Sequence, residues 1–115
     1  MQINIQALNF PLKKSLHDYI ERRLGFALSA RDSHIQRVIV QLSDINGPRG
    51  GIDKCCHILV VLSYQPNVVI EDTETDIFVA VDRAADRAGR TVGRRLARRR
   101  DRQRATGKSY ADLTD

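Results

Sequence analysis

The segment from residue 76 to residue 104 restricts the fold more than any other, because its residues sort into two faces at helical spacing. At about 100° per residue, five arginines fall within an arc of about 80°. This arginine face consists of Arg83, Arg87, Arg90, Arg94 and Arg98. The opposite side carries small apolar residues, namely Val81, Ala84, Ala85, Ala88, Val92 and Leu96. The pattern predicts a helix that packs one side on a core and presents a row of guanidinium groups on the other.

The positive charge of the chain is concentrated in the same segment. Between residues 83 and 104 there are ten arginines and two aspartates, a net charge of +8, whereas the whole chain carries +5. The rest of the chain is therefore mildly acidic, and such a distribution suits the binding of a polyanion. The alternative is a charged surface that only solubilises the protein. A mixed Glu and Lys surface would do that equally well, and nearly every charge here is arginine, so we favour nucleic acid.

Length and composition indicate one folded domain. A chain of 115 residues suits a single domain, and 42% hydrophobic with 29% charged residues argue against disorder. No apolar run approaches the about 20 residues that cross a bilayer. The first ten residues also lack the charged start and the cleavage site of a secretory signal. We expect a cytoplasmic protein without a membrane partner.

Neither the cysteines nor the acidic residues predict a metal site. Cys55 and Cys56 are neighbours, which point to opposite faces of a strand, so buried free thiols are expected. Cys55 and His57 share a face, but a second pair of ligands at zinc spacing is missing. An acidic cluster before the long helix consists of Glu71, Asp72, Glu74 and Asp76. Helix capping and the helix dipole explain this cluster better than a divalent cation does, so no metal or cofactor is expected.

Hydrophobic periodicity predicts elements in the order β-α-β-β-β-α. The predicted strands cover residues 2–8, 35–43, 55–64 and 68–74, and the predicted helices cover residues 13–28 and 76–104. Gly107 is expected to end the second helix, which leaves one domain at 1–104 and a flexible tail at 105–115. Because the apolar stripe ends at Leu96, residues 98–104 should project beyond the core.

These elements predict an α+β fold with a four-stranded mixed sheet and both helices on one face. The helix after the first strand makes strands one and two parallel, and the remaining strands form an antiparallel meander. Ile39, Leu59 and Val61 then lie on the open face of the sheet. Scattered exposed apolar residues are ordinary, whereas a contiguous patch would suggest a partner. Self-association is therefore possible but is not predicted.

Two stretches resemble the ribosome hibernation-promoting factors, also called ribosome-associated inhibitors or ribosomal subunit interface proteins. The run DIFVAVDRAADRAGR (76–90) has the family's acid, hydrophobic-aromatic pair and following basic residues. The run INIQALNFPLKKSLHDYIERRL (3–24) aligns without a gap. The matching positions are Leu16, Tyr19, Ile20, Arg23 and Leu24 in the first helix and Asp76, Phe78, Ala80, Val81, Asp82, Arg87, Arg90 and Arg94 in the second. The resemblance covers residues 2–100.

The resemblance implies a fold similar to a double-stranded-RNA-binding domain, and binding in the small-subunit channel where mRNA and tRNA sit. It further implies translation inhibition and ribosome hibernation under stress. Departures from the family pattern are Ala7 in place of a frequent glycine, Lys13 in place of a Ser or Thr cap, and a longer loop at 44–54. We expect the short form, without the C-terminal domain by which long members pair ribosomes.

We predict that the arginine face, together with Arg22 and Arg23 of the first helix, contacts ribosomal RNA phosphates. The planar arginine fork binds phosphate in a bidentate manner. Arg49, in the glycine-rich loop, is an alternative contact. With 5% aromatic residues and no Trp, base stacking is expected to contribute little compared with shape and phosphate recognition.

Two other classes of function have less support in the sequence. The histidines at 17, 34 and 57 fall on separate elements without a nucleophile–base spacing, and no nucleotide fingerprint occurs, so an enzyme with a small-molecule substrate is not expected. The remaining alternative is a general RNA-binding regulator without ribosome specificity.

Overall fold

The computed structural model describes residues 1–9, 11–45 and 53–114, with side chains as far as residue 102. The elements are β1 (Gln2–Leu8), α1 (Lys14–Leu28), a short 3-10 segment η1 (Ser29–His34), β2 (Ile35–Asp44), β3 (Lys54–Leu62), β4 (Val68–Glu74) and α2 (Ile77–Thr114). Apart from η1, this is the predicted order. Arg49, the alternative RNA contact, lies outside the described residues.

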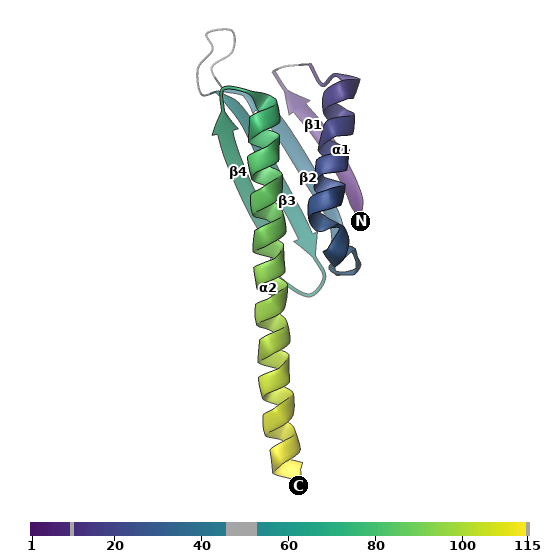
Figure 1. The fold of residues 1–115 in the computed structure, drawn as a ribbon, viewed down its shortest axis with the longest axis vertical. Coiled ribbons are helices and arrows are strands. Elements are labelled where there is room, and N and C mark those ends of the chain that lie inside the picture. Colours follow the sequence, from purple (N-terminus) through teal and green to yellow (C-terminus); the bar gives the residue numbers. More distant parts are fainter. Residues whose placement is uncertain (10, 46–52, 115) are drawn as a thin grey trace.

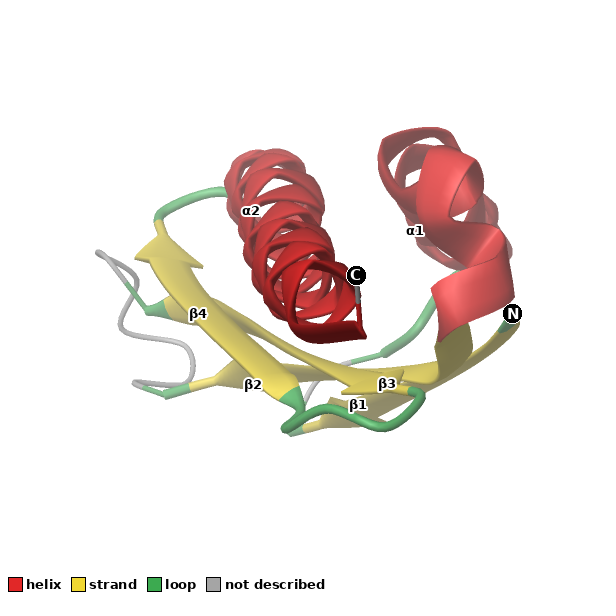
Figure 2. Ribbon diagram, turned by 90° about the horizontal axis from the view of Figure 1, so that it is seen from below, coloured by secondary structure: helices red, strands yellow, loops and turns green. Residues whose placement is uncertain are grey.

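The four strands form one sheet in the order β1-β2-β3-β4. β1 runs parallel to β2, whereas β2, β3 and β4 pair in an antiparallel manner. A parallel pair needs a crossover connection, and α1 supplies it between β1 and β2. Both helices lie on the same face of the sheet (Figure 2). The predicted α+β fold with a mixed sheet is therefore confirmed.

The core fills the space between the helices and the covered face of the sheet. Strand alternation directs one set of side chains to the helices, including Val38, Val40 and Leu42 of β2 and Ile58, Val60 and Leu62 of β3. α1 adds Leu16, Ile20, Leu24 and Leu28, and α2 adds mainly small residues such as Ala84, Ala85, Ala88 and Val92. Because the side chains of α2 are small here, its backbone approaches its neighbours closely.

The two helices approach each other closely at Gly89 of α2 and Ala27 of α1. A Cβ atom at Gly89 would lie 2.9 Å from the main-chain oxygen of Ala27. Main-chain atoms of a packed helix move only if the helix itself moves. The packing of the two helices therefore requires glycine at position 89. No local pattern in the sequence indicates this requirement.

We expect Gly89→Ala to lower the free energy of unfolding by about 1 kcal/mol, because overpacking costs about 1–3 kcal/mol and the better helix propensity of alanine returns about 1 kcal/mol. Gly25→Ala in α1 is the matched control, since a Cβ atom there meets nothing within 4 Å, and it should stabilise the protein. Urea denaturation measures both. A Gly89→Ala variant more stable than the wild type would contradict the close packing.

The open face of the sheet carries a short apolar row. Ile39, Leu59 and Val69 are paired in register across β2, β3 and β4, and 59% of Val69 is exposed. Ile39, Leu59 and Val61 lie on this face as predicted. The contiguous row with Val69 was not predicted. The next cross-strand row is polar, consisting of Gln41, His57 and Glu71, so the apolar area is narrow.

α2 is longer than the sequence predicted. It continues through Gly107 to Thr114, so the predicted end near Arg104 was wrong. One glycine costs a helix only about 1 kcal/mol relative to alanine, and good helix formers surround it. The 38 residues span about 57 Å, and the last turns extend past the sheet (Figure 1). The flexibility of residues 105–115 stays a prediction. Across the described ranges, no helix combines the length and apolar character of a membrane span.

Candidate nucleic-acid interface

Asp82 of α2 receives hydrogen bonds from two side chains of α1. The Tyr19 hydroxyl donates to Asp82 Oδ1, and Arg23 Nε donates to the same oxygen over 2.9 Å. A second Arg23 nitrogen donates to the Asp82 main-chain oxygen over 3.2 Å. The Tyr19 ring also packs edge-on against Phe78, with ring centroids 5.1 Å apart. Tyr19, Arg23, Phe78 and Asp82, which we call the helix clamp, thus join the two helices.

The charge state of Asp82 depends on the same contacts. Burial alone would raise the pKa of Asp82, but the hydrogen bonds from Tyr19 and Arg23 and the charge of Arg23 outweigh burial, so the pKa is lowered. The hydrogen bond to Asp82, followed by burial, raises the pKa of Tyr19. At neutral pH the carboxylate is therefore ionised and the phenol is protonated, which is the combination that the clamp requires.

We expect Asp82→Asn to lower the free energy of unfolding at pH 7 by about 1–2 kcal/mol. A hydrogen bond to a charged group is worth about 1.5–3 kcal/mol, and 44% of the Asp82 side chain is exposed, which reduces the effect. Because the folded pKa is lowered, the stabilisation is present above the unfolded pKa of about 4 and is lost as the pH falls through the folded pKa. Thermal unfolding at pH 7, 5 and 3 should show the two proteins converging at acid pH. A difference independent of pH would contradict an ionised acceptor.

Two predicted RNA contacts, Arg22 and Arg23, lie at this clamp. Arg23 is paired with Asp82, and 27% of its side chain is exposed. The Arg22 guanidinium lies 5.6 Å from the centroid of the Tyr19 ring. Both arginines therefore have structural contacts that the sequence did not indicate, and their contact with RNA stays a prediction.

The N-terminal half of the arginine face lies beside acidic residues of β4. Arg83 Nε is 3.2 Å from Glu74 Oε1. Arg87 donates to the Glu71 main-chain oxygen over 2.8 Å and lies 3.6 Å from Asp72. These ion pairs reduce the charge that Arg83 and Arg87 offer to a polyanion.

The acidic cluster therefore has two roles. Asp76 caps α2, because the main-chain N–H of Phe78 donates to Asp76 Oδ1 over 2.8 Å, as predicted. Asp72 and Glu74 instead pair with the arginine face, which was not predicted. Sequence spacing could not reveal these pairs, because β4 and α2 meet only through the fold.

The available positive charge increases toward the C-terminal end of the arginine face. Arg90 pairs with Asp86 one turn earlier over 3.1 Å, and both side chains are largely exposed. Arg94 donates to the Thr91 hydroxyl over 3.4 Å. Among the side chains described up to residue 102, neither Arg94 nor Arg98 forms an ion pair with a carboxylate. Arg90, Arg94 and Arg98 are therefore the strongest candidates for phosphate contacts.

Two arginines outside the arginine face hold the turn between β3 and β4. Arg95 donates to the main-chain oxygens of Pro66 and Asn67 over 2.7 and 3.0 Å. Arg99 donates to the main-chain oxygen of Ser63 over 3.2 Å. The prediction that residues 98–104 lie clear of the core was thus wrong at Arg99. α2 passes alongside this turn, so one side of α2 stays in contact with the turn beyond Leu96, where the apolar stripe ends.

A cavity of about 560 Å³ lies between α1 and α2. Its charged lining consists of Arg23, Arg31, Arg90, Arg94 and Asp86, and Gly89 and Gly93 contribute the surface of α2. Four arginines against one acid make this cavity suited to an anion. Arg31 was missed by the sequence analysis, because it belongs to η1 and reaches α2 only through the fold.

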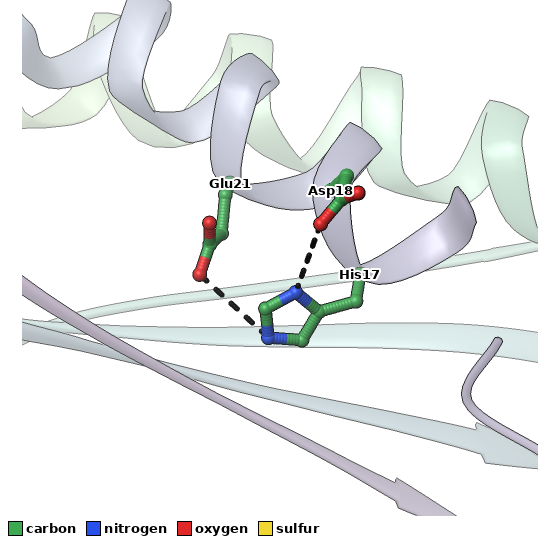
Figure 3. A group of neighbouring side chains, drawn as sticks. All are labelled: His17, Asp18 and Glu21. Atoms are coloured by element: carbon green, nitrogen blue, oxygen red, sulfur yellow. Dashed lines mark ion pairs between the residues drawn. The ribbon is translucent and has the colours of Figure 1, made fainter. Parts of the chain in front are cut away.

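His17, Asp18 and Glu21 of α1 form a cluster of metal-ligating residue types (Figure 3). His17 Nδ1 lies 3.5 Å from Asp18 Oδ1, and His17 Nε2 lies 3.6 Å from Glu21 Oε1. The two carboxylates thus approach opposite nitrogens of one ring, which cannot both bind the same ion. The geometry therefore fits polar contacts between neighbouring side chains of α1 rather than a metal centre.

The cysteines are both free and buried, as predicted. Burial, followed by the nearby Cys55 and Asp72, raises the pKa of the Cys56 thiol to about 12. A metal binds the thiolate rather than the thiol, so Cys56 is a poor ligand.

The sequence matches the model of the family described as sigma 54 modulation protein / S30EA ribosomal protein over residues 3–100. No curated protein matches significantly. The N-terminal domain of Protein Y from Thermus thermophilus is similar in structure, with a TM-score of 0.69 and 26% identity, over 82% of this chain and 98% of that one. A ribosomal subunit interface protein from Coxiella burnetii shares the fold, with a TM-score of 0.72 and 15% identity, over 84% of this chain and 99% of that one. These matches confirm the resemblance found in the sequence, and the chain belongs to the sigma 54 modulation protein / S30EA ribosomal protein family.

Proposed function

We propose that this protein binds the ribosomal RNA of the small subunit in the channel used by mRNA and tRNA, and that its occupancy inhibits translation and promotes ribosome hibernation. The observation that carries the proposal is that Arg94 and Arg98, at the C-terminal end of the arginine face, are exposed and have no carboxylate partner among the described side chains, on a chain of a ribosomal protein family. Such a protein acts in the cytoplasm.

The physical basis is phosphate recognition by a rigid helix. Arg94 and Arg98 lie one turn apart on α2, so their guanidinium groups can follow a phosphate backbone. Packing against the sheet and the β3–β4 turn fixes the direction of α2, which lowers the entropy lost on binding. The domain then inhibits by occupying volume and matching charge, without a chemical step.

Fractionation of a cell lysate on a sucrose gradient tests the proposal. The protein should migrate with the small subunit and with whole ribosomes, and it should return to the top of the gradient at high salt. Binding to isolated small subunits should persist in excess unrelated duplex RNA. If that competitor removes the protein, a general RNA-binding regulator describes it better than a ribosome-binding factor.

A further inference from the structure

Next to the cavity between α1 and α2 lies a second cavity of about 780 Å³, between η1, the β3–β4 turn and α2. Arg31, Gly93 and Ala97 line both cavities. The two cavities adjoin along α2, and we call them together the aromatic groove because an exposed ring lines each half. Phe26 lines the first half and is 82% exposed, and Tyr64 lines the second half and is 92% exposed.

Tyr64 is held in this position at an energetic cost. Its φ angle is 61°, a left-handed conformation that is a genuine outlier for a bulky residue. The Arg99 guanidinium lies 5.9 Å from the centroid of the Tyr64 ring and also donates to the main-chain oxygen of Ser63. Strained backbone conformations of this kind cluster at binding and active sites, and here the strain lies at an exposed ring next to an arginine.

The side of α2 that faces the groove is kept small. A Cβ atom at Gly93 would lie 2.8 Å from a terminal nitrogen of Arg31, so glycine leaves room for the Arg31 guanidinium. Gly89, Gly93 and Ala97 follow one another at four-residue spacing and all line the first half of the groove. These small residues allow the Arg31 guanidinium to lie against α2, where the two halves of the groove meet.

The walls carry far more positive than negative charge. The arginines are Arg23, Arg31, Arg90 and Arg94 in the first half and Arg31, Arg99 and Arg100 in the second. Asp86 is the acid that lines these cavities in the described part of the chain. Guanidinium groups beside exposed aromatic rings match the chemistry of unpaired nucleotides, in which phosphates alternate with flat bases.

We propose that the aromatic groove binds a short stretch of single-stranded RNA, whose bases stack on Phe26 and Tyr64 and whose phosphates contact Arg31 and Arg94. The proposal rests on the proposed ribosome-binding function and adds the form of RNA that this surface takes. The low aromatic content of the sequence led us to expect that base stacking contributes little. The proposal differs, because the positions of Phe26 and Tyr64 matter more here than the number of aromatic residues. Duplex RNA keeps its bases stacked inside the helix, so it offers nothing to either ring.

Fluorescence anisotropy with the full chain tests this proposal, using a labelled oligouridine and a duplex of similar length. Phe26→Ala and Tyr64→Ala should each weaken oligouridine binding by about 5- to 150-fold, because stacking on one ring contributes that much per base. Binding of the duplex should change by less than twofold. Val69→Ala, at an exposed position on the far face of the sheet, is the control and should change neither. Equal losses for duplex and single strand, or no loss for either, would overturn the proposal.

A second pair of variants tests the groove without removing a ring. Gly93→Leu should displace the Arg31 guanidinium, a proposed phosphate contact, and weaken oligouridine binding. Its melting temperature should not fall, because leucine is the better helix former and the displaced group ends a flexible side chain. Gly25→Leu points into open space and should bind like the wild type. Unchanged oligouridine binding by Gly93→Leu would contradict a site in the groove.

Small-subunit binding separates this inference from the proposed function. If the ring variants lose oligouridine binding but the wild type does not bind small subunits, RNA binding in the groove is supported and the proposed ribosome-binding function is contradicted. If the wild type binds small subunits and the ring variants bind oligouridine normally, RNA binding in the groove is contradicted and the proposed ribosome-binding function is supported.

Discussion

Replacing Arg90, Arg94 and Arg98 with glutamine is expected to weaken binding to the small ribosomal subunit by about 100-fold at 0.15 M salt. Each phosphate contact contributes about 0.7–0.9 to the slope of log K against log salt, so the triple variant should also lose about two to three units of that slope. Titration of labelled small subunits at several salt concentrations gives both quantities. The fold should remain intact, because all three side chains are on the exposed side of α2 and glutamine suits a helix.

Arg83 and Arg87 provide the matched control on the same helix face. Both already pair with acidic residues of β4, so their replacement by glutamine should change affinity and salt slope much less. Lysine at the three tested positions keeps the charge but loses the planar fork, so the slope should survive with a smaller loss of affinity. If the glutamine triple variant binds like the wild type, the arginine face is only a solvated surface.

In a purified translation system, inhibition should increase in proportion to the amount of protein added. Because the proposed mechanism is occupancy of a binding site, initiation should fall linearly and approach zero near one protein per ribosome. The glutamine triple variant should require a correspondingly higher concentration. Strong inhibition at far below one protein per ribosome would instead indicate a catalytic mechanism and would contradict occupancy.

The sequence predicted the fold because each element carried its own periodic pattern. Alternation in β2 and β3 placed Val38 and Ile58 in the core, and the apolar stripe of α2 located the buried helix side. Asp76 was identifiable as a cap from its position alone. The end of α2 was misjudged, because Gly107 was treated as a stop although a single glycine is tolerated within a helix. The segment η1 was not predicted, and the strand predicted at 55–64 ends at Leu62, before the turn that contains Tyr64.

The candidate site was predicted less well, because its contacts join residues far apart in the chain. Arg83 and Arg87 seemed free in the sequence, yet β4 supplies their partners. Tyr19, Arg23 and Asp82 matched the family pattern without any indication that they bind one another. Phe26 and Tyr64 lie on separate elements, and no spacing rule connects them to Gly93. These features arise from tertiary packing, which local patterns do not encode.

Competition between this protein and initiator tRNA for the small subunit tests the proposed site in the mRNA and tRNA channel most directly. Small subunits carrying labelled protein would be titrated with mRNA and initiator tRNA, and the bound fraction would be followed by anisotropy. We expect bound protein to fall as the tRNA concentration rises, and prebound protein to prevent tRNA from binding. Simultaneous, independent binding of both would contradict a site in the mRNA and tRNA channel.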